Sequence, residues 1–173
     1  LRDLGSALAP DNAFAIIQGL ETVALRMKQH CENAEKVVNF LKKHKEVTKV
    51  IYSTEHEKKI ADRAKQYLKG GNGPMVGIEL KGGIEAGKKF IESLKMFYHV
   101  ANIGDARSLA IHPASTTHSQ LNEKELAASG VTQSYVRLCI GIEHIDDIID
   151  DLDQALNKSC LLYTSDAADD WQG

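Results

Sequence analysis

The hydrophobic positions at the start of this chain predict one long helix. From Asn12 to His44, apolar residues recur every three or four positions, which places them on one stripe of an α-helix. At about 1.5 Å per residue, an unbroken helix of this length would run roughly 50 Å, more than a small domain can cover. We therefore expect its first half to pack on something outside this chain. Gly19 marks either a close backbone approach or a kink.

The pattern after this helix alternates between short strands and helices. Strands are expected at 47–52, 75–80, 97–102 and 134–141, and helices at 57–68, 84–95, 123–129 and 145–157. The glycine-rich stretch 70–73 follows a helix and precedes a strand, so it indicates a helix end and a turn rather than a phosphate-binding loop. The fold class predicted is α/β: a two-layer sandwich with a four-stranded, mostly antiparallel sheet.

These elements divide the chain into three parts. Residues 1–44 form a first segment with the long helix, and residues 45–158 form a domain. Residues 159–173 have neither a helical nor a strand period and contain the only tryptophan, Trp171. We expect this end to be a non-native or disordered tail, with an authentic docking tail as the alternative.

Composition and charge exclude several classes of function. The chain has 173 residues, with 24 acidic and 21 basic side chains and a net charge of −3, so it carries no electrostatic footprint for nucleic acid or anionic membrane. No apolar run approaches the ~20 residues that cross a bilayer. The cysteines, Cys31, Cys139 and Cys160, are widely spaced, which favours reduced thiols over a disulfide framework or a zinc site.

Arg137 is the strongest candidate for a binding residue. It lies in the middle of the expected strand 134–141, where alternation places Val136 and Leu138 on one face and Tyr135, Arg137 and Cys139 on the other. A desolvated guanidinium needs an anion, because leaving it unpaired is costly. The partner is either an acidic side chain of this chain, in a structural ion pair, or a substrate carboxylate gripped by the planar guanidinium.

A second group of polar residues follows the third expected strand, in the segment 102–121. His112 and His118 are six residues apart across a proline loop, a spacing that does not suit a zinc site. Ser108 with these histidines and Asp105 suggests a hydrolase triad, but no nucleophile elbow is present. We expect the remaining histidines at the surface or at helix caps; they are His30, His44, His56, His99 and His144.

Four separated stretches resemble a known enzyme family. They are NAFAIIQGLETVALRM from Asn12, HCENAEKVVNFL from His30, ANIGDARSLAIHPASTTHSQL from Ala101 and VRLCIGIEHIDDIIDDLDQAL from Val136. In this order they are similar to the C-terminal part of the cysteine/methionine-metabolism enzymes that depend on pyridoxal 5'-phosphate. Within that family the resemblance is closest to the sulfhydrylases that act on O-acetyl-L-homoserine.

The resemblance implies a fold, a reaction and a setting. The chain would be the small C-terminal domain of a fold-type I pyridoxal-phosphate enzyme, and the long helix would bridge it to the N-terminal cofactor domain. The reaction would replace the acetate of O-acetyl-L-homoserine with sulfide and give L-homocysteine, a step of methionine biosynthesis. The family is usually a cytoplasmic homotetramer that acts on small amino acids, without nucleic acid or membrane partners.

The resemblance also implies roles for individual residues. Arg137 stands where the family's arginine holds the substrate α-carboxylate, and Asn102 stands where related lyases carry a serine that helps to bind the same group. Thr117 and His118 match a loop at the mouth of the site. The family provides no metal site and no catalytic residue within this stretch.

The chain departs from the family pattern in what it lacks. The family's lysine that binds the cofactor covalently sits in a Ser-x-Thr-Lys motif upstream of these stretches, and this sequence has no such motif. Because that amine performs covalent binding and proton transfer, we expect this chain alone to be inactive. The alternatives within the family are methionine γ-lyase, cystathionine γ-synthase and cystathionine γ-lyase. The alternative of another class is a non-catalytic regulatory or oligomerisation module.

Overall fold

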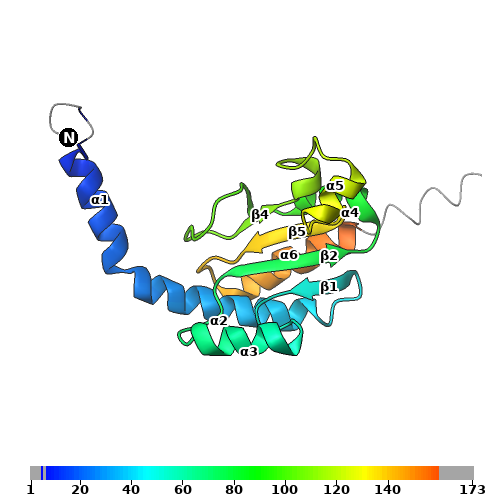
Figure 1. Ribbon diagram of the computed structural model, residues 1–173, viewed down its shortest axis with the longest axis horizontal. Coiled ribbons are helices and arrows are strands. Elements are labelled where there is room, and N and C mark those ends of the chain that lie inside the picture. Colours follow the sequence, from blue (N-terminus) through cyan, green and yellow to red (C-terminus); the bar gives the residue numbers. More distant parts are fainter. Residues whose placement is uncertain (1–4, 6, 160–173) are drawn as a thin grey trace, which may run out of the picture.

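A five-stranded sheet with helices against one face forms the body of the molecule (Figure 1). The computed structural model describes residue 5 and residues 7–159. The helices are α1 (Pro10–Glu21), α2 (Val23–Leu41), α3 (Lys58–Tyr67), α4 (Gly83–Ser93), α5 (Glu123–Ala128) and α6 (Ile145–Ser159), with a 3-10 turn η2 (Pro113–Ser115). The strands are β1 (Val47–Ile51), β2 (Met75–Leu80), β3 (Tyr98–His99), β4 (Leu109–Ile111) and β5 (Tyr135–Cys139).

The sheet is mixed, in the order β1-β2-β5-β4-β3. The pairs β1–β2, β2–β5 and β5–β4 are antiparallel, and β3 runs parallel to β4. The prediction of an α/β sandwich with a mostly antiparallel sheet is confirmed, but its count of four strands is wrong. The missing strand is β4, whose three residues are too few to show a period in the sequence.

The hydrophobic core lies between the sheet and the helices α2, α4 and α6. Alternation along the strands sends one set of side chains into it, and the largest that are fully buried include Val76, Ile78 and Leu138 from the strands and Phe90, Leu152 and Leu156 from the helices. The opposite face of the sheet carries Arg137, and among the described residues the helices α2, α4 and α6 all contribute to the core on the other face.

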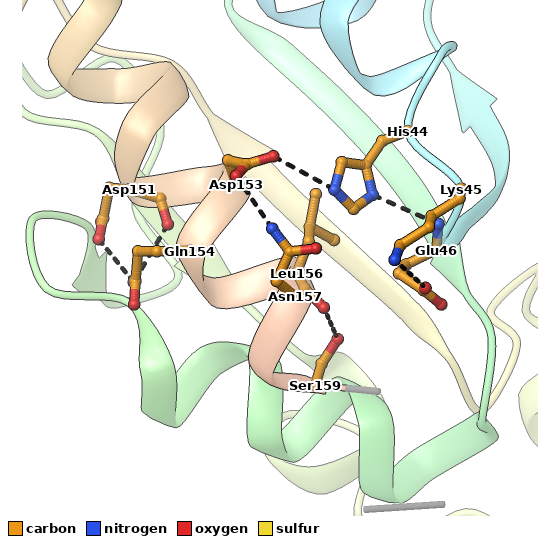
Figure 2. Close-up of polar contacts among 9 residues, drawn as sticks. All are labelled: His44, Lys45, Glu46, Asp151, Asp153, Gln154, Leu156, Asn157 and Ser159. Atoms are coloured by element: carbon orange, nitrogen blue, oxygen red, sulfur yellow. Dashed lines mark hydrogen bonds and ion pairs between the residues drawn. The ribbon is translucent and has the colours of Figure 1, made fainter. Parts of the chain in front are cut away.

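Polar contacts fix α6 at the rim of this core (Figure 2). The carboxylate of Asp153 lies 3.4 Å from Nε2 of His44, just after the end of α2. Asp151 is buried, and its two oxygens accept hydrogen bonds from the backbone N–H groups of Lys95 (2.9 Å) and Met96 (2.8 Å). The carboxylate therefore ties the segment between α4 and β3 to α6.

The long first helix is not continuous, and a kink near Gly19 was one of the two alternatives that the sequence left open. It divides into α1 and α2 at Thr22, whose backbone (φ −108°, ψ 5°) is not helical. The change of direction comes three residues after Gly19, whose carbonyl oxygen accepts a hydrogen bond from Nη2 of Arg26 (2.9 Å). In Figure 1, α1 projects away from the sheet, and none of its residues is buried.

The two ends of the domain differ from the predicted boundaries in detail. The second half of α2 belongs to the core, with Ala34, Val37, Val38 and Leu41 buried. At the other end α6 continues to Ser159, which is buried and donates to the carbonyl of Leu156 (2.7 Å). The rest of the predicted tail, 160–173, lies outside the described residues.

Candidate functional site

Arg137 lies at the centre of the sheet, on the face away from the core. It pairs with Gly77 of β2 on one side and Ile111 of β4 on the other. Its neighbours Val136 and Leu138 are fully buried in the core, while Arg137 is partly exposed. The predicted alternation of β5 is therefore confirmed, and the guanidinium projects from the face that the long helices leave open.

The contacts of Arg137 are made with carbonyl groups. Its Nη2 donates to the carbonyl oxygens of Ala101 (2.8 Å) and Asn102 (3.3 Å), in the loop between β3 and β4. Within the described residues the guanidinium makes no ion pair and no further hydrogen bond. A carbonyl oxygen carries only a partial charge, so these contacts orient the side chain without neutralising it.

The side chains around Arg137 supply no competing anion. Burial raises the pKa of the Tyr135 phenol and of the Cys139 thiol, so both stay neutral at neutral pH although Arg137 opposes the shift. The carboxylate on the same face of β2, Glu79, pairs with Lys49 at 3.3 Å. The structural ion pair that the sequence left open is thus not formed by these neighbours, and the positive charge remains available to a ligand.

Arg137 also helps to line a cavity of about 210 Å³. It is lined by the end of β1 and the following loop (Ile51, Tyr52, Ser53, His56), by β2 (Met75, Val76, Gly77) and by β5 (Tyr135, Arg137). Gly77 is required here because a Cβ atom at this position would lie 2.6 Å from the ring of Tyr135. Arg137 and Tyr135 are therefore held side by side at the wall of this cavity.

The other predicted site residues lie in exposed loops. The structure brings Asn102 to Arg137 through its backbone carbonyl, and the residue itself is exposed. Thr117 and His118 follow η2 and contact each other, Oγ1 to Nδ1, at 2.8 Å. No described contact joins these two residues to Arg137.

The hydrolase triad suggested by Ser108 does not form. Its hydroxyl donates to Glu143 (2.9 Å) and accepts from the backbone N–H of Gly141 (2.8 Å). His112 is fully buried and contacts the hydroxyl of Ser115 and the carbonyl of Gln133 instead. Ser108 is therefore a structural residue, held between two loops.

His30 lies where the sequence did not predict it, and the contacts of Glu143 were not predicted. His30 was expected at the surface or at a cap, but it is buried in α2 and its Nδ1 lies 2.6 Å from the carbonyl oxygen of Ile140. Glu143 was not singled out, although it holds Ser108. The string CIGIEH after Arg137 was the available signal, since a carboxylate between apolar and glycine positions at a strand end needs partners.

Metal and membrane functions find no support in the described part of the chain. It contains no group of three or more histidine, cysteine or acidic side chains arranged to hold a metal ion. Cys31 and Cys139 are buried free thiols. None of the described helices is long and apolar enough to cross a membrane.

Comparison with known proteins gives the family. The model of the Cys/Met metabolism PLP-dependent enzymes matches residues 1–157. The chain belongs to this family. It is 52% identical over 159 residues to an O-acetyl-L-homoserine sulfhydrylase of Leptospira meyeri, covering 91% of this chain and 36% of that protein. An L-methionine gamma-lyase of Fusobacterium nucleatum is 43% identical, covering 91% of this chain and 40% of that protein.

A solved structure also matches this chain. A crystal structure of an O-acetylhomoserine (thiol)-lyase from Campylobacter jejuni is 44% identical, with a TM-score of 0.81 over 90% of this chain and 37% of that chain. That crystal structure contains N'-pyridoxyl-lysine-5'-monophosphate. This chain matches its C-terminal portion and spans a little over a third of the length of these relatives.

The described residues do not form a site for the cofactor by themselves. No lysine lines the cavity at Arg137, and its polar side chains are those of Tyr52, Ser53, His56, Tyr135 and Arg137. These groups suit a small carboxylate rather than the covalent attachment of an aldehyde, which needs an amine.

Proposed function

We propose that this chain is the C-terminal, substrate-binding part of a pyridoxal-phosphate enzyme that converts O-acetyl-L-homoserine and sulfide into L-homocysteine and acetate. Arg137 binds the α-carboxylate of the substrate, and Asn102, Thr117 and His118 complete the mouth of the site. The enzyme is a cytoplasmic homotetramer, and this chain alone is inactive. When bound, pyridoxal phosphate supplies the electron sink on which such replacement reactions depend.

The observation that carries this proposal is the state of the Arg137 guanidinium. It stands on the open face of the sheet and beside a cavity, held by two carbonyl groups and by no carboxylate of the described residues. With Nη2 used by the loop, Nη1 and Nε remain as donors toward a carboxylate. Binding the substrate through its carboxylate fixes its orientation. A fixed orientation lowers the activation free energy, because the translational and rotational entropy is already lost on binding.

The test uses a completed enzyme, which we define as this chain joined to the upstream part of the Leptospira meyeri sulfhydrylase. Arg137→Ala should raise KM for O-acetylhomoserine by about 100-fold, since a lost charged hydrogen-bond pair costs roughly 3 kcal/mol. The KM of Arg137→Lys should fall between those of the unchanged enzyme and Arg137→Ala, because an ammonium keeps the charge but not the directed N–H donors of the guanidinium. The visible absorbance of the cofactor and KM for sulfide should not change.

The matched control is Arg63→Ala, which removes an exposed arginine of α3 outside the cavity. It should leave KM for both substrates unchanged. An Arg137→Ala enzyme with unchanged KM for O-acetylhomoserine would remove Arg137 from the substrate site.

A second candidate is γ-elimination, which is favoured by the identity of 43% to the Fusobacterium nucleatum L-methionine gamma-lyase. Replacement keeps the amino group in the product, whereas elimination releases it as ammonia. The completed enzyme should form homocysteine from O-acetylhomoserine and sulfide and release little ammonia from methionine. Rapid release of ammonia from methionine would favour the lyase instead.

A further inference from the structure

Glu143 lies in the loop between β5 and α6, and its carboxylate holds the residue before β4. Oε1 accepts a hydrogen bond from the backbone N–H of Ser108 at 2.6 Å, and Oε2 accepts one from the Ser108 hydroxyl at 2.9 Å. Two acceptor atoms thus face two donors of one residue, as in a capping interaction. Hydrogen bonds to an ionised carboxylate are about twice as strong as neutral ones.

Further hydrogen bonds join the loop of Glu143 to the loop before β4. The Ser108 hydroxyl accepts from the N–H of Gly141 (2.8 Å), and the N–H of Ile142 donates to the carbonyl of Ala106 (2.9 Å). From α2, the buried Asn33 donates to the carbonyls of Gly141 (3.0 Å) and Glu143 (2.9 Å). The two loops are therefore one hydrogen-bonded unit anchored on α2.

The packing inside this unit leaves no spare room. A Cβ atom at Gly141 would lie 2.2 Å from Oε2 of Glu143 and 2.5 Å from the backbone nitrogen of Ser108. Only glycine allows the carboxylate to come this close. The position of Glu143 is thus fixed by backbone as well as by its own hydrogen bonds.

Residues 101–108 form one loop, which is bound by Glu143 at Ser108 and contacts Arg137 at its other end. The carbonyl groups of Ala101 and Asn102 accept from Nη2 of Arg137, and between them and Ser108 the N–H of Gly104 lies 3.4 Å from Sγ of Cys139. Displacing Ser108 would therefore displace the carbonyls that orient the guanidinium.

We propose that Glu143 is a positioning residue for Arg137: it fixes the 101–108 loop, whose carbonyl groups aim the guanidinium at the substrate carboxylate. This inference rests on the function proposed above. Glu143 acts through the loop, and does not itself touch the substrate. A carboxylate suits this role because both of its oxygens accept as charged groups, whereas a carboxamide forms only neutral hydrogen bonds and turns the Ser108 hydroxyl from a donor into an acceptor.

The experiment is a double-mutant cycle in the completed enzyme, with Glu143→Gln, Arg137→Ala and the double variant. In the Arg137-containing enzyme, Glu143→Gln should lower kcat/KM for O-acetylhomoserine about tenfold, chiefly through KM, with cofactor absorbance retained. In the Arg137→Ala enzyme the same change should alter kcat/KM less than about twofold, because the residue through which it acts is gone. Glu85→Gln, at an exposed carboxylate paired with Lys88, is the matched control and should change neither value.

The outcomes separate this inference from the proposed function. If Arg137→Ala leaves KM unchanged, the proposed function fails. If Arg137→Ala raises KM, but Glu143→Gln has no effect or lowers kcat/KM equally in both backgrounds, only the role of Glu143 fails. Should Glu143→Gln not fold, Ser108→Ala removes the contact to Oε2 from the other side. That variant should show the same loss in the Arg137-containing enzyme alone, and an equal loss in both backgrounds would overturn the inference.

Discussion

The buried histidine of the 112–121 loop illustrates how single residues set the conditions under which this fold is stable. Nε2 of His112 lies 2.7 Å from the carbonyl of Gln133, so it carries the proton, and Nδ1 accepts from the Ser115 hydroxyl at 2.8 Å. A Cβ atom at Gly87 of α4 would lie 2.4 Å from Nε2 of His112. The ring is therefore enclosed in its neutral form.

Burial lowers the pKa of His112 below its usual 6.5, and the charge of Lys88 lowers it further, against the opposing hydrogen bond to Gln133. Below about pH 6.5 the unfolded chain binds a proton here that the folded chain does not, so the free energy of unfolding falls as the pH is lowered through that window. His112→Gln retains a donor for Gln133 and an acceptor for Ser115 but cannot titrate. Denaturant unfolding at several pH values should show a smaller decrease between pH 7 and pH 5 for the variant, and equal slopes would contradict the account.

The sequence could identify Arg137 but not its surroundings. Alternation in one strand was enough to place the guanidinium opposite the core, because a strand has a period of two. Its partners are backbone carbonyls of a loop more than thirty residues away, and no side-chain pattern encodes those. Glu143 and His30 escaped prediction for the same reason, since each bonds to groups brought near by tertiary packing.

Helices and strands were predictable where their periods run for several turns or pairs. Strand β2 has the predicted bounds, and α6 exceeds its predicted end by two residues. Strand β4 was missed because three buried residues show no alternation. A kink at Gly19 was one of two alternatives, and the exact position of the break at Thr22 could not be predicted because the apolar stripe continues through it.

The apolar side chains along α1 are exposed in this chain. Phe14 is 65% and Ile17 is 52% exposed, whereas Leu41 at the end of α2 is fully buried. In this chain alone, Phe14→Ser or Ile17→Ser should change the free energy of unfolding by less than about 0.5 kcal/mol. Leu41→Ala, the control for a core position, should cost about 2–5 kcal/mol.

The same substitutions should behave differently in the completed enzyme. There we expect α1 to be covered by the upstream part of the protein, so that Phe14→Ser lowers the denaturation midpoint measurably. Equal effects in the isolated chain and in the completed enzyme would contradict an interdomain role for α1.

For the whole molecule, we propose that substrate binding and cofactor chemistry are divided between two parts of a longer polypeptide. This chain spans a little over a third of its relatives' length and presents an unneutralised guanidinium on an open face. The cofactor and its lysine are assigned to the other part. The central claim is therefore that this domain binds the carboxylate of an amino-acid substrate.

The most direct measurement compares two inhibitors that differ only in that group, 2-aminobutanoic acid and 1-propylamine, against the completed enzyme. The unchanged enzyme should bind the amino acid about 100-fold more tightly than the amine, because only the acid reaches Arg137. In the Arg137→Ala enzyme the ratio of the two inhibition constants should fall close to one. A ratio that persists in that variant would contradict the claim that Arg137 binds the substrate carboxylate.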